Sequence, residues 1–150
     1  MRKAIELSIE NVRNGKGGPF GAVIVKNDLI IATGVNSVTA AHDPTAHAEM
    51  IAIRNACTVL KSFQLTDCEL YSSCEPCPMC LGAIYWARPK AVYYANSAHD
   101  AANIDFDDSF IYKQITLPHE QRTILFIQTM RQEGLKAFKL WNEKKDKITY

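Results

Sequence analysis

Two short segments of this 150-residue chain bring together residue types that can ligate a metal ion and move protons. His47 and Glu49 lie two residues apart. Further along, Cys77 lies three residues before Cys80, in the segment PCPMC. Imidazole nitrogen and thiolate sulfur are ligands that Zn²⁺ prefers, and a nearby carboxylate can serve as general acid and base. The combination therefore predicts hydrolytic chemistry at a zinc ion.

The spacing of these residues indicates how they converge. Residues three apart are neighbours on one helix face, so Cys77 and Cys80 can reach the same ion. His47 and Glu49 reach a common point only from a helix start, where side chains tilt toward the N-terminal end. We infer that the two helix starts face each other. His47, Cys77 and Cys80 would then be the ligands, with the fourth position of a tetrahedral zinc site open to water.

A water molecule in that position would have a pKa of about 7, so hydroxide is available without a strong base. Glu49 is then expected to be a proton shuttle rather than a ligand, taking a proton from this water and delivering it to a ring nitrogen and a leaving amine. H-x-E together with P-C-x-x-C is the signature of zinc deaminases of nucleobases. Either half alone would be a weak signal, because both occur in other contexts.

Cys74 raises two alternatives. With Cys77 and Cys80 it forms a ferredoxin-like run, but position 84, where the next cysteine of such a run would stand, is Ile84. A closed structural zinc site of three cysteines and His47 is the second alternative, and it would leave Glu49 beside the metal without a purpose. Both alternatives stay open beside the favoured catalytic site.

Hydrophobic periodicity and turn residues place the motifs on secondary structure. Asp43 and Pro44 fit an N-cap and first helical position, which puts His47 in a first helical turn. Asn27-Asp28 predicts a tight hairpin turn. The expected elements are helices over residues 2–13, 46–60 and 76–87, strands over 21–26, 29–35, 69–72 and 91–95, short helical pieces within 99–115, an apolar run of undecided type at 124–127, and a terminal helix containing Leu135, Phe138 and Trp141.

This order of elements predicts one domain over residues 1–150, an α/β fold with a mixed sheet and helices packed on it. Composition is that of a globular protein, with 47% hydrophobic and 22% charged residues. A net charge of +1 gives no strong field for a polyanion, so a small-molecule substrate is favoured and nucleic acid is not expected as a partner. Residues 1–20 show no signal-peptide pattern and no 18-residue apolar stretch occurs, so we expect a cytoplasmic protein without membrane association.

With these motifs identified, the chain resembles the cytidine deaminase superfamily and, within it, the bacterial guanine deaminases over nearly its whole length. Four segments support the resemblance: residues 17–25 (GGPFGAVIV), 43–49 (DPTAHAE), 73–88 (SCEPCPMCLGAIYWAR) and 106–112 (FDDSFIY). The second and third are shared across the superfamily, whereas Tyr85-Trp86 and the last segment resemble the guanine-specific part. Asp105 departs from the pattern, because similar chains tend to have glycine there.

The resemblance implies a three-layer α-β-α fold with helices on both faces of the sheet, one Zn²⁺ per chain, and a homodimer. It implies that His47, Cys77 and Cys80 bind zinc, that Glu49 shuttles protons, and that guanine is hydrolysed to xanthine and ammonia in purine catabolism. From spacing and composition alone, we can conclude only that the protein deaminates some amino-heterocycle.

The resemblance also suggests further pocket residues, each with an ordinary structural alternative. Asp108 would be a second catalytic carboxylate, or else a loop cap for the following helix. Asn36 would bind the base through its amide, or else be a turn residue at a strand end. Phe20 and Trp86 would stack on the purine, or else pack in the core. Tyr150 would close the pocket from a C-terminal tail, residues 142–150, of the same chain or of a partner subunit; the alternative is a solvated chain end.

Three other functions compete with this one. A tRNA adenosine deaminase shares the two motifs but must bind a polyanion, which the charge does not favour. A guanosine deaminase differs only in tolerating a ribose. An inactive zinc-binding module for protein interaction is the alternative from outside the enzymes, and the intact set of His47, Glu49, Cys77 and Cys80 argues against it.

Overall fold

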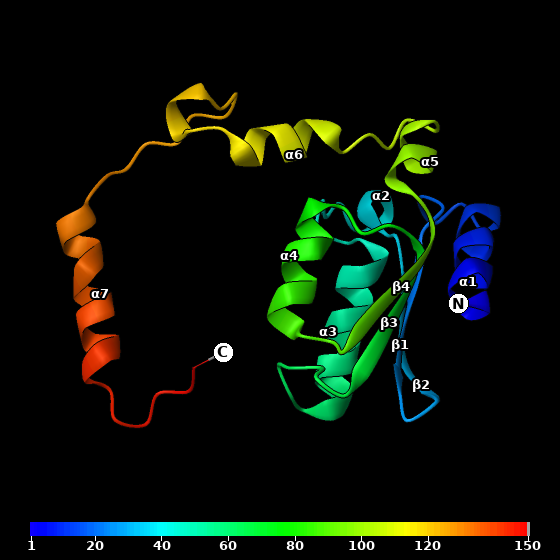
Figure 1. Cartoon of the computed structure of the whole chain (residues 1–150), viewed down its shortest axis with the longest axis horizontal. Coiled ribbons are helices and arrows are strands. Elements are labelled where there is room, and N and C mark those ends of the chain that lie inside the picture. The colour runs from blue at the N-terminus through cyan, green and yellow to red at the C-terminus, as the bar shows by residue number, and fades with distance from the viewer. Residues whose placement is uncertain (150) are drawn as a thin grey trace. The chain divides into compact units, whose positions relative to one another are not determined.

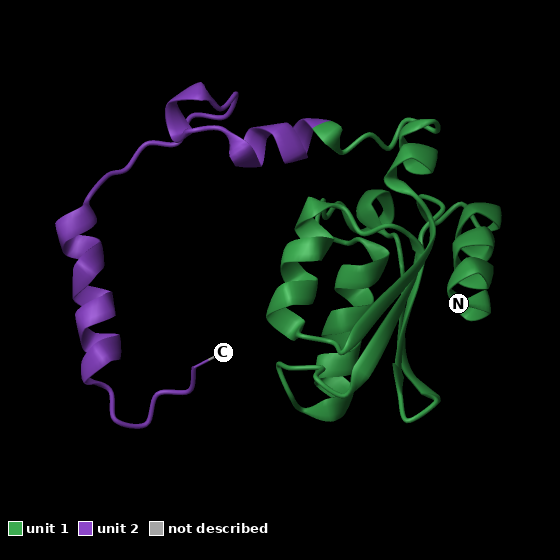
Figure 2. Cartoon of the chain, in the orientation of Figure 1, with its two compact units in different colours: residues 1–109 green, residues 110–150 purple. Residues whose placement is uncertain are grey.

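The computed structural model describes residues 1–149; Tyr150 lies outside the described residues. The chain divides into two compact units, residues 1–109 and residues 110–150 (Figure 2). The first unit contains all four strands and both predicted motifs.

A four-stranded mixed sheet organises the first unit, with strand order β2-β1-β3-β4. β1 is antiparallel to both of its neighbours, and β3 runs parallel to β4. The turn between β1 and β2 is the predicted one: Asn27 and Asp28 both have positive φ, at 50° and 62°, and the register pairs Lys26 with Leu29 across it. The strands are β1 (Gly21–Lys26), β2 (Leu29–Val35), β3 (Cys68–Cys74) and β4 (Ala91–Asn96).

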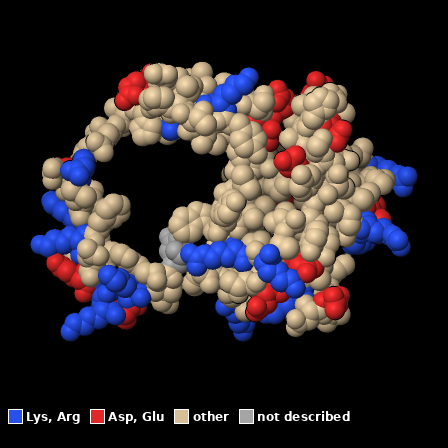
Figure 3. Space-filling model, in the orientation of Figure 1, with Lys and Arg blue, Asp and Glu red and all other residues tan. Residues whose placement is uncertain are grey.

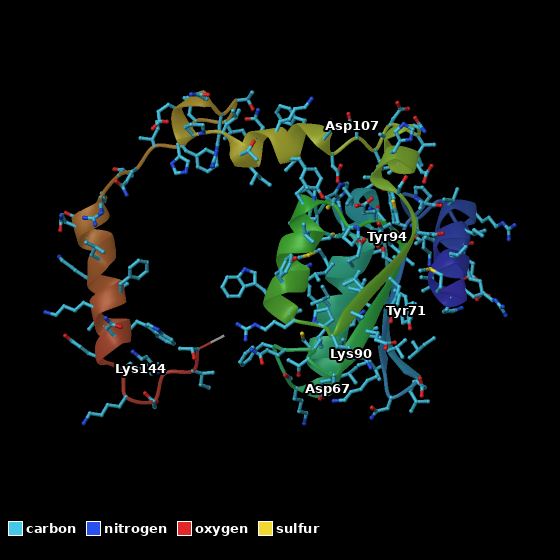
Figure 4. The ribbon with its side chains drawn as sticks, viewed as in Figure 1. Asp67, Tyr71, Lys90, Tyr94, Asp107 and Lys144 are labelled. Carbon is cyan, nitrogen blue, oxygen red and sulfur yellow. The ribbon has the colours of Figure 1, made fainter. Side chains whose placement is uncertain are left out.

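Helices cover both faces of this sheet, as the sequence predicted. α1 (Arg2–Arg13) lies on one face, and α3 (Ala48–Leu60) and α4 (Pro78–Ala87) lie on the other (Figure 1). The core beneath α3 and α4 contains the fully buried Ile24, Leu65 and Leu70. Glu69 of β3 accepts a hydrogen bond from Tyr71 of the same strand at 2.6 Å and pairs at 3.1 Å with Lys90, the residue before β4; Tyr71 and Lys90 are labelled in Figure 4.

Two helix starts differ from the sequence prediction. The helix expected from residue 46 begins at Ala48, because the Asp43 carboxylate accepts hydrogen bonds from the Thr45 backbone and hydroxyl and so closes a separate turn before it. His47 is therefore the N-cap residue, with extended backbone, and not part of the first turn. The helix expected from residue 76 likewise begins at Pro78, which leaves Cys77 as its N-cap. β3 is longer than expected, and the short helix α2 (Val38–Ala41) was not predicted.

The second unit consists of short helices joined by irregular chain. The last helix that lies wholly in the first unit is α5 (Ala98–Ala102). The elements that follow are α6 (Ser109–Thr116), η1 (His119–Gln121) and α7 (Arg131–Glu143), the predicted terminal helix. The apolar run at 124–127 forms neither helix nor strand. None of the described residues 110–149 is buried. Across residues 1–149, no helix is both long and apolar enough to cross a membrane.

Close contact between β2 and α3 requires a glycine at position 34. A Cβ added to Gly34 would lie 2.1 Å from the backbone oxygen of Ala48 and 2.6 Å from the backbone nitrogen of Ala52. Both are backbone atoms of α3, so no side-chain rotation could relieve the overlap. Since α3 begins directly after His47, this contact also fixes the position of His47 relative to the sheet.

Gly34→Ala is therefore expected to lower the free energy of unfolding by about 2 to 3 kcal/mol, because α3 must move away from the sheet. Gly82 in α4 is the matched control: a Cβ added there would meet nothing within 4 Å, and Gly82→Ala should raise stability by about 0.5–1 kcal/mol. Chemical denaturation of the two zinc-loaded variants measures both effects. Equal stability of the variants would contradict the close packing of α3 on β2.

Candidate metal centre

His47, Cys77 and Cys80 meet at one point. Among the described residues they form the group of potential ligands whose donor atoms all lie within 4.8 Å of one another. His47 Nδ1 is 3.4 Å from the Cys77 sulfur and 3.6 Å from the Cys80 sulfur. A tetrahedral zinc ion with ordinary Zn–N and Zn–S bond lengths separates such atoms by about 3.6 Å. The residues therefore fit zinc, as the sequence predicted.

Two helix N-termini supply these donors. His47 is the N-cap of α3, and its carbonyl accepts the first helical hydrogen bond from Ile51. Cys77 is the N-cap of α4 and Cys80 lies in its first turn. The approach to Cys77 is fixed by Glu75, whose backbone N–H donates to the Asn96 carbonyl and whose carboxylate accepts from the Ala98 N–H. The end of β4 thus anchors the loop that presents the cysteines.

The electrostatics of the three donors favour a cation. A hydrogen bond from Cys80 lowers the pKa of Cys77 to about 4, so this sulfur is a thiolate. The same hydrogen bond, together with burial, raises the pKa of Cys80. The pKa of His47 is raised because its ring donates to the Cys77 thiolate. Zinc binds cysteine as the thiolate, so metal binding at this site would release the protons of its thiol ligands.

Glu49 lies beside the ligands without joining them. It is 5% exposed, and burial raises its pKa above the usual value for a glutamate. Its Oε1 accepts a hydrogen bond of 2.8 Å from the Ser72 hydroxyl, and its Oε2 lies 3.5 Å from the Cys80 sulfur. A carboxylate held at this distance from the ligands, and outside the ligand group, can exchange protons with a molecule bound at the metal.

Cys74 takes no part in the centre. Its sulfur donates to the Ser97 carbonyl at 3.6 Å, and burial raises its pKa to about 11. It is absent from the ligand group found among residues 1–149. The closed site of three cysteines and one histidine, one of the sequence-based alternatives, is therefore not formed.

Asn36 follows β2 and is 7% exposed. Its side-chain oxygen accepts hydrogen bonds from the backbone N–H groups of Gly18 and Val38, at 3.3 and 3.4 Å. The side-chain nitrogen of Asn11 donates to the backbone oxygens of both Gly18 and Asn36, at 2.8 and 2.9 Å. The two bonds to the side-chain oxygen fix the orientation of the Asn36 amide. Among the described residues, its NH₂ group has no hydrogen-bond acceptor and can donate to a ligand.

Phe20 precedes β1 and packs partly against the core. Its ring meets Phe106 edge to face, with centroids 4.9 Å apart. Asp105, where similar chains tend to have glycine, has a φ of +70°. Aspartate tolerates this left-handed conformation better than most residues, so the loop can keep the turn that a glycine would allow.

Asp108 is half-buried, and its pKa is raised by burial and then by the negative charge on Cys77. The role expected of Asp108 as a second carboxylate of the pocket stays a prediction. Trp86 is placed differently. It lies in the last turn of α4, about 9 Å along the helix from Cys80, with a 62% exposed side chain. The structure does not bring Trp86 to the ligands of its own chain, and Tyr150 lies outside the described residues.

Sequence reasoning overlooked two residues that contact the site residues, Ser72 and Asn11. Ser72 could have been found from alternation along β3, where it follows Leu70 on the buried face and is polar immediately before the cysteine motif. Asn11 gave no comparable signal. Its place in α1 looks like an ordinary helical position, although it is 3% exposed.

The chain matches the family described as the cytidine and deoxycytidylate deaminase zinc-binding region over residues 1–96. That match contains His47, Glu49 and both cysteines. The chain is also similar to the guanine deaminase of Bacillus subtilis (strain 168), with 59% identity over 150 residues, which cover 100% of this chain and 96% of the relative.

The X-ray structure of guanine deaminase from Bacillus subtilis superimposes with a TM-score of 0.96 at 60% identity, covering 99% of this chain and 95% of that one. A tRNA-specific adenosine deaminase of Buchnera aphidicola subsp. Schizaphis graminum is 40% identical over 100 residues, 67% of this chain and 66% of the relative. The similarity to the Bacillus subtilis guanine deaminase covers the whole chain, including residues 101–150.

Cys77→Ser is expected to lose the bound zinc, because one of two sulfur ligands is replaced by a hydroxyl that zinc binds poorly. Cys74→Ser is the matched control, since Cys74 is a buried neighbour outside the ligand group. Metal analysis of the purified proteins should give about one zinc per chain for the wild type and for Cys74→Ser. Loss of zinc from the Cys74 variant would restore the closed structural site as an alternative.

Proposed function

We propose that this chain, which belongs to the cytidine and deoxycytidylate deaminase family, is a zinc-dependent guanine deaminase. It hydrolyses guanine to xanthine and ammonia. The observation that supports this most directly is the group of three potential zinc ligands, His47, Cys77 and Cys80, with a buried carboxylate, Glu49, beside it. Full-length similarity to a guanine deaminase selects the substrate among the amino-heterocycles that such a centre could attack.

His47, Cys77 and Cys80 would hold the zinc ion, which would supply a water molecule with a pKa near 7. Glu49 has the remaining task of moving protons. Its Oε2 lies 3.5 Å from the Cys80 sulfur, and burial raises its pKa above the usual value, which favours a group that can accept a proton and release it again. The carboxyl group can therefore take one proton from the attacking water and pass it to a ring nitrogen as the C–O bond forms. It can then take the second proton of that oxygen and pass it to the amine, which leaves as ammonia when the C–N bond breaks.

Two further polar groups are assigned to the purine. Asn36 would donate its amide NH₂ to an acceptor on the base, which the fixed orientation of its side chain supports. Asp108 would act as a second carboxylate that hydrogen-bonds the base or passes protons to the leaving amine, which its half-buried position and raised pKa support. Stacking on the flat ring is assigned to Phe20, which Phe106 braces edge to face.

Charge supports a free base over a tRNA substrate. The net charge is +1, and acidic and basic side chains are interspersed on the face of the molecule in Figure 3. A tRNA deaminase needs several phosphate contacts from Lys and Arg, which a basic surface would supply. Guanosine stays the nearest competitor, because the room for a ribose decides between the two.

We propose that the chain forms a homodimer, and the exposed apolar side chains of the second unit are the observation that supports this proposal. A segment that buries none of its apolar residues has no hydrophobic term to stabilise it, so residues 110–150 need a surface to cover them. We assign that surface to a second copy of the chain, which makes residues 1–150 one deaminase domain completed by its partner. In this arrangement residues 142–150, Tyr150 and Trp86 could reach a pocket across the dimer. The exposed apolar side chains of the second unit include Phe110, Ile115, Leu125, Phe126, Ile127, Phe138 and Leu140.

A cytoplasmic location is also proposed. All five cysteines are free thiols in the structure, and two of them are needed as zinc ligands. A reducing compartment keeps such sulfurs available for the metal ion, whereas an oxidising one favours disulfides.

Ammonia release from a substrate panel tests the assignment of guanine. Guanine should be turned over, with slower or no release from guanosine, adenine, cytosine and a tRNA anticodon stem-loop. Turnover of the RNA alone would show that tRNA, not guanine, is the substrate. Turnover of guanosine alone would show that the nucleoside is the substrate.

Glu49→Gln tests the proton shuttle and the inactive-module alternative together. The amide cannot carry the proton, so kcat should fall by at least roughly 10² to 10⁴ while zinc stays bound. Zinc content by metal analysis and kcat on guanine are the two measurements. Full activity in this variant would remove Glu49 from the reaction, and a wild type without any turnover would favour a binding module.

Analytical ultracentrifugation tests the homodimer. The wild type should sediment at twice the chain mass of 16.8 kDa, and Ile127→Asp should shift it toward the monomer, because a charge is placed on a side chain that is 78% exposed in the single chain. Leu29→Asp is the matched control, since Leu29 is 69% exposed but lies at the β1-β2 turn. A monomeric wild type would refute the dimer.

A further inference from the structure

Ser72 is a buried hydroxyl that contacts the proposed proton shuttle. It lies on β3, opposite Ala22 of β1 and Tyr94 of β4, and its side chain is 1% exposed. Its Oγ donates a hydrogen bond of 2.8 Å to Oε1 of Glu49, and both residues are buried. A hydroxyl at a core position of a strand is costly unless it is hydrogen-bonded, so this contact explains why a polar residue is tolerated there.

The direction of this hydrogen bond is set by a second one. The backbone N–H of Cys74 donates to Ser72 Oγ at 3.4 Å, which occupies a lone pair of the hydroxyl and leaves its proton for Glu49. The chain of contacts therefore runs from the Cys74 amide through Ser72 to the carboxylate. Since Cys74 is three residues before Cys77, the same strand end holds both the carboxylate and the loop that presents the zinc ligands.

The two oxygens of Glu49 consequently have different surroundings. Oε1 is bound to Ser72, whereas Oε2 lies 3.5 Å from the Cys80 sulfur and faces the metal ligands. The terminal torsion of a glutamate has a broad and roughly two-fold energy profile, so packing of the stem alone does not fix the carboxylate plane. A directional hydrogen bond to one oxygen does fix it.

We propose that Ser72 is a positioning residue for the reaction: its hydroxyl anchors one oxygen of Glu49 and thereby keeps the other turned toward the metal ligands. This inference rests on the proposed function, in which Glu49 moves protons. Ser72 touches neither substrate nor metal, so its effect reaches the reaction only through the orientation of the carboxylate. Proton transfer is sensitive to such orientation, because donor and acceptor must lie within hydrogen-bond reach.

Ser73 provides a matched control on the same strand. It is also a serine, it is 2% exposed, and its Oγ accepts a hydrogen bond of 3.0 Å from the Gly21 N–H. As the adjacent strand residue it points to the opposite face of the sheet, away from Glu49. Ser72→Ala and Ser73→Ala each remove one buried hydroxyl and the hydrogen bond that it accepts from a backbone N–H, but only the first also removes a hydrogen bond to the carboxylate.

The experiment compares kcat, KM and zinc content of the zinc-loaded wild type, Ser72→Ala, Ser72→Thr and Ser73→Ala, on whichever amino-heterocycle the wild type deaminates. Ser72→Ala should lower kcat by roughly 10- to 100-fold, the loss expected for one hydrogen bond to a charged group, with KM and zinc content unchanged. Ser72→Thr keeps the hydroxyl and should recover most of kcat. Ser73→Ala should keep the kcat of the wild type, whatever its effect on stability.

Three results would overturn the assignment: wild-type kcat in Ser72→Ala, an equal loss of kcat in Ser73→Ala, or a loss of kcat in Ser72→Ala that follows the loss of zinc. Failure of the proposed function would look different, because the wild type itself would then release no ammonia from guanine. The alanine variant removes volume and introduces no clash, so the comparison stays valid even where the threonine variant is too large for its site.

Discussion

The meeting of two helix N-termini at one point is the constraint on which the rest of the structure depends. His47 caps α3 and Cys77 caps α4, so the position of the metal centre is fixed by how those helices lie on the sheet. Gly34 lets α3 approach β2 closely, and Glu75 ties the start of α4 to the end of β4. A change in either contact would separate the donors even if every ligand were kept.

This convergence places three acidic groups close together, which is costly without a cation. The hydrogen bond with Cys77, followed by burial, raises the pKa of Cys80, and burial is the main cause that raises the pKa of Glu49. Like charges disfavour one another strongly in a poorly solvated site. A divalent ion held by His47, Cys77 and Cys80 would offset this repulsion.

Much of the fold and the central site could be predicted from the sequence because both depend on local signals. The Asn27-Asp28 turn, the β-branched strands and the spacing of Cys77 and Cys80 each reflect interactions over a few residues. The helix starts were misplaced by two residues for the same reason. Asp43-Pro44 carries a valid local signal for a helix start, but its carboxylate closes a turn instead, and the helix begins only after His47.

Contacts between distant segments were beyond such reasoning. Ser72 meets Glu49 across 23 positions and Asn11 meets Asn36 across 25, and neither pairing follows from a motif. Periodicity predicted α7 from Leu135, Phe138 and Trp141, yet those side chains stay exposed within their own unit. A hydrophobic stripe shows which side chains gain by burial, but a local pattern has no information about which surface would cover them.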